Sequence, residues 1–381
     1  MTEIGKVFGQ TAAEFATTAV VRAAADAGVA VGDIDGMLVS SGIHERIGLR
    51  IAEDLGMRDL RMLAEVNSFG ATATAMVQQA SLAILSGAAT TVACVFADAP
   101  LVQDRGSAGA YSGFTAAGTA GYALASGVNS ATAMYALGAR RHMETYGTTK
   151  EQLGAVAVST RAWATRNPLA QHRTPLSLEQ YLSARMITDP LGLYDCCLVS
   201  NGGIAVIVTS AERAADGPHA AVNVVAWAQS HLAQSMERGG DFGIRTGAAE
   251  AAPRLFAMAG IDRSDVTVAE LYDCFTYTTL VTLEDYGFCQ KGEGGPFVES
   301  GAIAPGGSLP VNTGGGELSS YYMWGMTPLS EGIIQCRGEG GERQVADHDV
   351  VLVTGNGGFF EHHGGLILSP VATLRAEAVA A

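Results

Sequence analysis

The sequence predicts an α/β protein whose two halves are alike and related by a pseudo-twofold axis. A faint internal repeat supports this, because Asp26–Val39 (DAGVAVGDIDGMLV) aligns without gaps with Met258–Leu271 (MAGIDRSDVTVAEL). Both segments read as the end of a helix, a glycine cap, an Asp turn and an apolar strand. In each half a turn with Asn and Gly, a helix and a strongly apolar strand then follow. This alternation indicates two similar α/β layers packed together.

The turn of the first half lies in the segment from Glu65 to Asp98. A strand stub leads into Gly70, a long helix rich in Ala, Thr, Met and Leu follows, and Ser86-Gly87 precedes a second apolar strand. This layout is typical of enzymes that present a nucleophile at the N-terminus of a helix. Glycine has no side chain, so the nucleophile itself is missing.

The repeat also predicts the domain organisation. The turn of the second half, Asn312–Gly316, precedes a helix and the apolar strand of DVVLVTGNGG. We place the boundary between the halves near Gly217-Pro218, which gives units of residues 1–217 and 218–381. Residues from about 100 to 190 fit the repeat poorly and are expected to form an insertion, which starts with a stretch rich in Gly, Ser and Ala.

Composition narrows the classes of function. With 381 residues, 48% of them hydrophobic, the chain can bury a large core, and its apolar stretches are too short to span a membrane. A net charge of −15 argues against nucleic-acid binding, which needs clustered cations. The six cysteines form no CxxC pair, which favours reduced, buried thiols. The N-terminus shows no signal-peptide pattern, so we expect a cytoplasmic protein without membrane insertion.

A series of motifs resembles the thiolase superfamily, specifically its sterol-carrier (lipid-transfer) branch. In chain order these motifs are VNSFGATAT, YGTTKEQLGAVAVSTRAWATRNP, DPLGLYDCCLVSNGGIAVIV, ELYDCF, NTGGGELSSYYMWGMTPLSEG and GNGGFFEHHGGLIL. The resemblance covers nearly the whole chain. It implies a thiolase fold, in which the two α/β halves form a five-layer αβαβα core with an inserted loop domain.

Three motif positions of that family carry different residues in this chain. Gly70 stands where the family has its nucleophilic Cys, Tyr272 where it has the His of a His-Asp-Cys-Phe motif, and Met326 where it has the His of Gly-His-Pro. Claisen condensation or thiolysis needs a thiolate to carry the acyl group, and Cys274 is expected to face the interior. The protein is therefore either a binding module or an enzyme whose reaction needs no acyl-enzyme.

A retro-aldol cleavage forms no acyl-enzyme and fits the remaining residues. In this reaction a β-hydroxyacyl-CoA loses its hydroxyl proton, the Cα–Cβ bond breaks, and a ketone and an acyl-CoA enolate result. A Schiff-base lysine is not expected, since the three lysines lie in polar settings. A metal is not expected either, because Glu361–His363 is the nearest approach to a ligand cluster and adjacent strand residues point to opposite faces. We expect no cofactor, with CoA as part of the substrate.

Tyrosines remain as candidate acid and base. Tyr272 occupies a catalytic position of the family, and Tyr321 and Tyr322 lie just before Gly325. A phenol can donate to an enolate or an alkoxide as it stands, whereas to act as a base its pKa must fall from about 10. We assign Tyr272 and Tyr322 to catalysis and Tyr321 to substrate binding, because neighbours cannot both face the site. A core residue with a satisfied hydroxyl is the alternative for each.

The resemblance also suggests groups that bind the thioester and the CoA. The family forms its oxyanion hole from backbone N–H groups at the turns of Gly70 and Gly357-Gly358, and Met326 is expected at the substrate pocket. His362 and His363 are candidates to relay a proton, with a structural role as the alternative. Arginines of the insertion are candidates to bind the CoA phosphates: these are Arg140, Arg141, Arg161, Arg166 and Arg173.

Among thiolase-like families, this pattern looks most like the steroid side-chain aldolases. The resemblance implies cleavage of a 17-hydroxy steroid with a three-carbon CoA-ester side chain, giving a 17-ketosteroid and propionyl-CoA. It also implies a homodimer that binds an OB-fold acyl-CoA-binding accessory protein, together a heterotetramer. Two other functions fit the sequence: acyl transfer or thiolysis through a partner's thiol or a displaced Cys, and a non-catalytic acyl-CoA or sterol carrier or inactive thiolase subunit.

Overall fold

The first half is built on a four-stranded sheet. The computed structural model describes residues 1–42, 47–107, 110–111, 119–232, 241–372 and 374. The sheet has the strand order β2-β1-β3-β6, in which β1 runs parallel to β2 and β3, and β6 runs antiparallel to β3. Its strands are β1 (Gly36–Ser40), β2 (Met62–Glu65), β3 (Thr91–Asp98) and β6 (Gly202–Thr209).

The second half repeats this arrangement. Its sheet has the order β7-β10-β9-β8, with β8 parallel to β9 and the other pairs antiparallel. The strands are β7 (Asn223–His231), β8 (Val268–Glu270), β9 (Val351–Gly357) and β10 (His362–Ser369). On this pattern β1, β3 and β6 correspond to β8, β9 and β10. The N-terminal residues take the place of β7, because Thr2 N–H donates to Gly203 O at 2.9 Å and Gly5 bridges Asn201.

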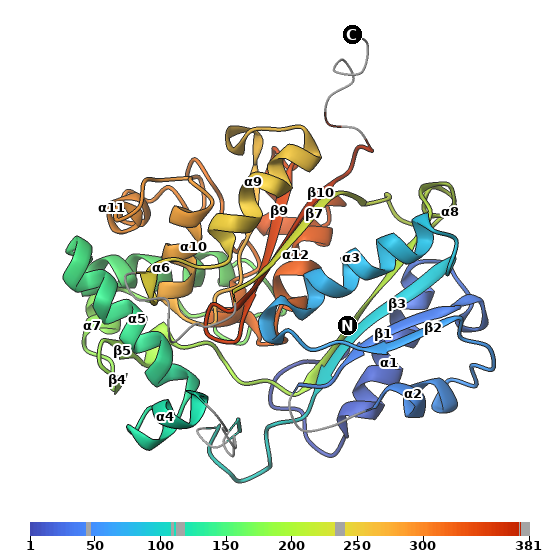
Figure 1. Ribbon diagram of the computed structural model, residues 1–381, viewed down its shortest axis with the longest axis horizontal. Helices are drawn as coiled ribbons and strands as arrows, with labels where there is room; N and C mark the ends of the chain where they lie inside the picture. Colours follow the sequence, from blue (N-terminus) through green and yellow to red (C-terminus); the bar gives the residue numbers. More distant parts are fainter. Residues whose placement is uncertain (43–46, 108–109, 112–118, 233–240, 373, 375–381) are drawn as a thin grey trace.

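Helices complete a five-layer αβαβα core, as expected from the sequence (Figure 1). The central layer holds α3 (Thr72–Leu85) and α12 (Met326–Cys336), and each contacts strands of both sheets. Most residues of both helices are buried, as a helix between two sheets requires. The outer layers hold α1 (Ala12–Asp26), which covers β3 and β6, and α9 (Ala248–Ala259), which covers β7 and β10.

The sequence repeat maps onto equivalent structure. Gly28 follows α1 and Gly260 follows α9, and both adopt left-handed conformations, with φ of +67° and +65°. A short 3₁₀ turn comes next in each half, Val31–Asp33 and Arg263–Asp265, before β1 or β8 begins. A left-handed residue after a helix favours glycine because it has no Cβ.

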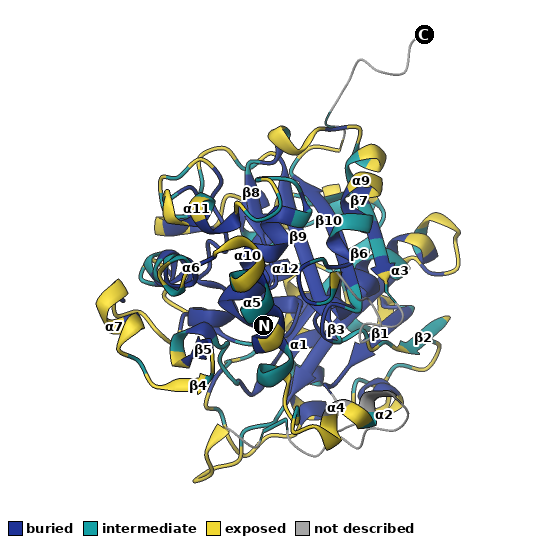
Figure 2. Ribbon diagram, turned by 60° about the vertical axis from the view of Figure 1, so that its left-hand side comes forward, coloured by how far each residue is buried: buried dark blue, intermediate teal, exposed yellow. Residues whose placement is uncertain are grey.

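The insertion lies to one side of the sheets, together with helices of the second half (Figure 1). Its helix α6 packs against α10 and α11. The elements concerned are α4 (Thr119–Ala125), α5 (Ala131–Tyr146), α6 (Lys150–Ala164), α7 (Leu178–Leu182), β4 (Met186–Thr188), β5 (Leu191–Gly192), α10 (Thr276–Asp285) and α11 (Gly294–Glu299). Burial follows the layers, with dark blue sheets and an exposed rim at α7 and β4 (Figure 2).

Two further α-helices are short, α2 (Gly48–Asp54) after β1 and α8 (Ala211–Ala215) after β6. The chain passes from the first sheet to the second between Thr209 and Asn223, and the predicted boundary near Gly217-Pro218 lies in this connection. The independence of the two units stays a prediction. Among the residues described, no helix is long and apolar enough to cross a bilayer.

Candidate active site

The N-termini of the two central helices meet at Gly70. The turn before α3 is held by its own side chains, because Phe69 N–H donates to Asn67 Oδ1 at 3.0 Å and Ser68 N–H to Thr72 Oγ1 at 2.9 Å. Gly325, which precedes α12, lies against this turn so closely that a Cβ there would be 2.4 Å from Gly70 O. The fold therefore brings the predicted nucleophile turn and the Met326 segment together.

A tyrosine ring fills the space that a side chain at position 70 would need. A Cβ built on Gly70 would lie 2.2 Å from Cζ of Tyr272 and 2.2 Å from the backbone oxygen of Asn356. Real Cβ atoms do not approach other atoms this closely. Position 70 therefore carries no nucleophile, and the Tyr272 ring occupies the volume that a nucleophilic side chain would need.

Tyr272 and Tyr322, the two tyrosines predicted to be catalytic, form a hydrogen-bonded pair. Their hydroxyl oxygens are 2.9 Å apart, although the residues are 50 positions apart in the chain. Tyr272 is held by its N–H, which donates to Thr354 Oγ1 at 3.2 Å, and Tyr322 by its N–H, which donates to Ser200 Oγ at 3.1 Å. Tyr272 is 4% exposed and Tyr322 is partly exposed. One phenol donates to the other, so the pair keeps one hydroxyl hydrogen for a substrate.

Both phenols are held in the neutral form. Burial raises the pKa of Tyr272 well above 10, and Tyr322 raises it further. Burial likewise raises the pKa of Tyr322 well above 10, with a further contribution from Cys197. A buried phenolate without a cation is unfavourable. The pair is therefore suited to donate and relay protons, and no lowered pKa marks either phenol as a resident phenolate base.

The glycine turns predicted to bind the thioester oxygen do meet. A Cβ on Gly357 would lie 2.3 Å from Ser68 O and 3.0 Å from Gly70 N, so the end of β9 touches the Gly70 turn. Gly358 follows with a left-handed φ of +58°. The two turns thus place their backbone amides at one location beside the tyrosine pair.

The two candidate histidines lie on opposite faces of the second sheet. The His362 ring stacks on Phe69 at a centroid distance of 6.3 Å, and its Nδ1 is 2.9 Å from Nδ1 of His231. Burial lowers the pKa of His362, with a smaller effect from His231. His362 is therefore a mostly neutral imidazole next to the Gly70 turn, which is compatible with the predicted proton relay.

His363 faces the outer helical layer, so its predicted catalytic role is wrong. Its Nε2 is 2.9 Å from the hydroxyl of Tyr286, and burial lowers the pKa of His363 to about 3. The neighbouring Gly364 faces Thr74 of the central helix α3, whereas Gly365 faces Tyr286. The alternation of strand side chains thus sends His363 away from Tyr272.

No thiol has the character of a displaced nucleophile. All six cysteines are free, and burial raises the pKa of each one. Cys274, next to the pair in sequence, is 5% exposed and its thiol pKa lies well above 9. A nucleophilic cysteine needs a lowered pKa. Within the described part of the chain no group of His, Cys, Asp and Glu side chains could hold a metal ion.

Known proteins resemble this chain in sequence and in fold. A model of the thiolase C-terminal domain-like family matches residues 228–370. A steroid side-chain-cleaving aldolase from Thermomonospora curvata is 37% identical over 94% of this chain and 93% of that protein. A 17-hydroxy-3-oxo-4-pregnene-20-carboxyl-CoA lyase from Mycobacterium tuberculosis is 33% identical over 94% of each. A solved Ltp2-ChsH2(DUF35) aldolase superposes with a TM-score of 0.86 at 34% identity, covering 97% of this chain and 95% of that one.

The chain belongs to the family of steroid side-chain-cleaving aldolases. The resemblance to thiolase-like proteins that lack the nucleophilic Cys, and the predicted thiolase fold, are both confirmed.

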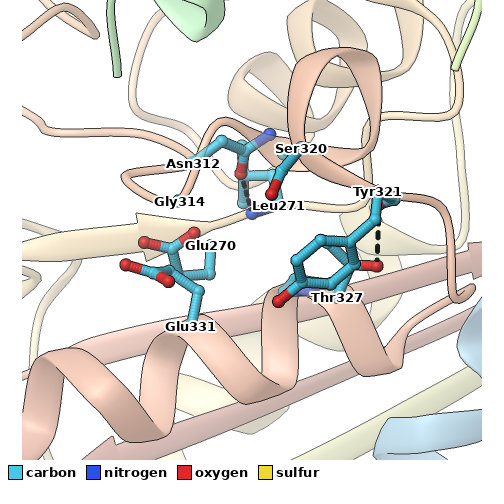
Figure 3. Close-up of a pocket in the computed structure, with 10 residues that line it drawn as sticks. Glu270, Leu271, Asn312, Gly314, Ser320, Tyr321, Thr327 and Glu331 are labelled. Atoms are coloured by element: carbon cyan, nitrogen blue, oxygen red, sulfur yellow. Dashed lines mark hydrogen bonds between the residues drawn. The ribbon is translucent and has the colours of Figure 1, made fainter. Parts of the chain in front are cut away.

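Two predicted substrate-binding residues of this aldolase-family chain, Tyr321 and Met326, differ in where they lie relative to the tyrosine pair. Tyr321, which is drawn in Figure 3, has an extended backbone. Its hydroxyl lies 3.4 Å from Ser330 Oγ, whereas that of Tyr322 contacts Tyr272. Tyr321 lines a small enclosed pocket that also includes Glu270 and Glu331. Met326 is fully buried at the start of α12 and packs in the same core cluster as Tyr272. Tyr321 faces away from the pair, so its predicted role is wrong, whereas the substrate-binding role of Met326 stays a prediction.

The arginines of the insertion do not form one phosphate site. Arg140 pairs with Asp189, and the guanidinium Nη1 of Arg141 donates to Phe242 O at 3.2 Å. Arg161 is buried and donates to Ser319 Oγ at 2.9 Å and to Thr174 O at 3.2 Å.

Arg161 therefore supports the fold, and burial lowers the pKa of its guanidinium. Arg166 and Arg173 line a surface cleft of about 320 Å³ that faces residues 339–343. They remain the candidates for phosphate binding in this aldolase family member.

Sequence reasoning missed several residues around the pair. Tyr111 packs its ring edge against Tyr322 at a centroid distance of 6.1 Å and donates to Asp98 Oδ2 at 3.2 Å. Two buried carboxyl groups lie close to the paired tyrosines in the sequence: Asp273 near Tyr272, and Glu317 near Tyr322. Both lie inside motifs that resemble the family, Asp273 in ELYDCF and Glu317 in NTGGGELSSYYMWGMTPLSEG, which was a usable signal.

Proposed function

We propose that this protein is a carbon–carbon lyase that cleaves the side chain of a steroid acyl-CoA by a retro-aldol reaction. The substrate is a 17-hydroxy steroid with a three-carbon CoA-ester side chain, and the products are a 17-ketosteroid and propionyl-CoA. The observation that carries the proposal is the hydrogen-bonded pair of neutral tyrosines in place of the thiol nucleophile. The names of the relatives from Thermomonospora curvata and Mycobacterium tuberculosis support the substrate class.

In this proposal a proton moves in a circuit through the pair. Tyr322, which is partly exposed, takes the hydroxyl proton of the substrate while it passes its own proton to Tyr272. The O–H electrons form the ketone, the Cα–Cβ bond breaks, and its electrons pass into the thioester as an enolate. Tyr272 gives its own proton to Cα as it receives the proton of Tyr322, so that neither phenol carries two hydrogens at any point. Both phenols are neutral before and after the reaction, which agrees with their raised pKa values.

The enolate oxygen needs hydrogen-bond donors that keep their positions during the reaction. The amides at Gly70 and Gly357-Gly358 are suited to this role, because these turns pack against each other beside Tyr272. His362, next to the Gly70 turn, is the remaining candidate for exchanging protons with solvent. The reaction requires no acyl-enzyme and no cofactor other than the CoA of the substrate.

Substrate binding is proposed to involve a second protein. The solved Ltp2-ChsH2(DUF35) aldolase is a complex, which supports an OB-fold acyl-CoA-binding partner for this chain as well. A partner would also supply cations that a chain with a net charge of −15 lacks. We propose a homodimer that binds two such partners as a heterotetramer in the cytoplasm, with Arg166 and Arg173 as contacts for the CoA phosphates.

The test is an acyl-CoA chromatogram. The protein, with the OB-fold partner that copurifies with it, is incubated with a steroid-CoA that carries a tertiary β-hydroxyl group. We expect ketone and propionyl-CoA in equal amounts. General acid–base catalysis contributes about 10²–10⁴ in rate, so Tyr322→Phe should lower turnover by about that factor.

Tyr321→Phe is the matched control, because the neighbouring ring faces Ser330 instead of the pair, and it should keep turnover. Intact substrate with binding demonstrated would refute the lyase and favour an acyl-CoA or sterol carrier.

A further inference from the structure

The turn between β9 and β10, residues 358–361, has an unusual backbone. Three consecutive residues are left-handed: Gly358, Phe359 and Phe360 have φ of +58°, +56° and +64°. Glycine adopts this conformation freely, whereas in phenylalanine it is strained, because Cβ comes too close to the following carbonyl oxygen. Two adjacent phenylalanines in this conformation need other contacts to hold them there.

This strained turn belongs to the candidate active site. It begins with Gly358, whose amide is among those proposed to bind the enolate oxygen, and a Cβ on the preceding Gly357 would lie 3.0 Å from Gly70 N. Directly after the turn, His362 stacks on Phe69 at a centroid distance of 6.3 Å. Backbone strain of this kind gathers at functional sites and persists only where the surrounding structure holds it. The conformation of the turn therefore decides where its amides lie.

Both phenylalanine rings of the turn pack on one tyrosine of the insertion, Tyr135 on α5. The ring centroids of Phe359 and Phe360 lie 5.3 and 4.9 Å from that of Tyr135, at interplanar angles of 78° and 71°. Edge-to-face contacts at such distances are favourable. Phe242 packs on Phe359 at 5.3 Å, and Tyr277 packs on Phe360 at 6.1 Å. Each ring of the turn thus has a fixed place in the core, and it holds the backbone to which it is attached.

Tyr135 also contacts the segment that carries Tyr272. Its ring lies 4.8 Å from that of Phe275, which is three positions after Tyr272. Burial raises the pKa of Tyr135 well above 10, and a backbone hydrogen bond of Phe359 opposes that increase, so the neutral hydroxyl also contacts the turn. Tyr135 therefore connects the turn after β9 with the segment of the tyrosine pair, although it comes from a third element of the fold.

We propose that Tyr135 is a positioning residue, which holds the rings of Phe359 and Phe360 and through them fixes the amides of the enolate-binding turn. The ring contacts offset the strain of two left-handed phenylalanines, so the turn has its active conformation before the substrate binds. Donors that are already in place stabilise a developing charge without reorganisation. The inference rests on the proposed lyase function and adds to it the side chains that set its enolate-binding turn.

The deciding variants are Phe359→Ala and Phe359→Gly. Both remove the ring, but alanine keeps the strain of a left-handed residue, whereas glycine has none. We expect Phe359→Ala to lower kcat by about tenfold to 100-fold, as a displacement of about 1 Å at the reacting groups does, with an unchanged KM. Phe359→Gly should recover most of that loss. Equal kcat values for the two variants, or a lower one for Phe359→Gly, overturn the inference, because a ring that only fills the core gives that order.

Tyr135→Leu tests the residue that holds the two rings. We expect kcat to fall by about tenfold or more with an unchanged KM, and Tyr135→Phe, which keeps the ring, to retain most of kcat. Tyr286→Leu is the matched control, because Tyr286 is also buried and packs on two phenylalanine rings, Phe256 and Phe288, in the outer helical layer. It should keep kcat. A folded Tyr135→Leu protein with wild-type kcat contradicts the proposal.

Thermal melts cover the case in which Tyr135→Leu does not fold. Phe359→Gly should melt at a higher temperature than Phe359→Ala, because alanine is unfavourable where φ is positive, and the reverse order refutes the strain on which the inference depends. The wild type and Tyr322→Phe are assayed in parallel. Product formed by the wild type and lost in Tyr322→Phe, with equal kcat for the two Phe359 variants, refutes the positioning role alone. No product from the wild type refutes the lyase and the inference with it.

Discussion

Replacing Gly70 by alanine should disable the enzyme, although it adds a single methyl group. The added Cβ would lie 2.2 Å from Cζ of Tyr272 and 2.2 Å from the backbone oxygen of Asn356, against an ordinary contact of 3.4–4 Å. The Tyr272 ring and the end of strand β9 must then both move by about 1 Å. Overpacking of this kind costs about 1–3 kcal/mol of stability, or more where backbone must move. A displacement of about 1 Å at reacting groups costs about 100-fold in rate.

The assay for Gly70→Ala is a thermal melt together with kcat for steroid-CoA cleavage. Gly32→Ala is the matched control, because nothing lies within 4 Å of a Cβ at that position and its backbone conformation suits any residue. We expect Gly32→Ala to keep both stability and rate. A Gly70→Ala protein with wild-type melting temperature and turnover would show that Tyr272 does not occupy this volume, and the reasoning about the missing nucleophile would fail.

Two further predictions concern groups away from the pair. The neutral form of His363 is favoured by folding, with a pKa of about 3 against an ordinary 6.5. The contribution of neutral His363 to the free energy of unfolding is therefore complete above pH 6.5 and is lost as the pH falls towards 3. The loss is about 5 kcal/mol, at about 1.4 kcal/mol per pKa unit. Unfolding curves at several pH values should show that His363→Gln flattens this acid dependence, and an unchanged dependence would contradict it. Thiol-alkylating reagents should leave cleavage intact, because the thiols beside the pair, Cys197 and Cys274, have raised pKa values; inactivation of a protein that is still folded would revive a thiol mechanism.

The repeat and the motif order were enough to predict the fold. Gly28 and Gly260 mark equivalent helix ends in the sequence, and both have the left-handed conformation that the pattern requires. The two tyrosines could also be proposed from the sequence, because Tyr272 replaces a residue at a known position and Tyr322 lies just before Gly325. The 2.9 Å contact between them could not, since it depends on how two loops 50 residues apart pack.

Other site residues depended on information that a sequence does not contain. The pattern predicted that one of His362 and His363 faces the site, but the direction of the pleat was set by the register of β10 against β9. The arginines are close in sequence but are separated by helices that carry them to different partners. Glu317 lies inside the motif NTGGGELSSYYMWGMTPLSEG, but a sequence does not show that its carboxyl group is buried without a hydrogen-bond partner among the described residues.

The exchange of a thiol nucleophile for a tyrosine pair is a coupled change, because two positions compete for one volume. A side chain at position 70 and the ring of Tyr272 cannot coexist, so Gly70 is a requirement of the tyrosine site and not only the loss of a cysteine. Clearing the ring would not make room by itself, since the oxygen of Asn356 lies equally close to a Cβ at position 70. The hydrophobic Met326, buried at the start of α12, offers no base to a restored thiol. The same backbone thus supports two different chemistries, and the change between them requires several residues and the position of a strand to change together.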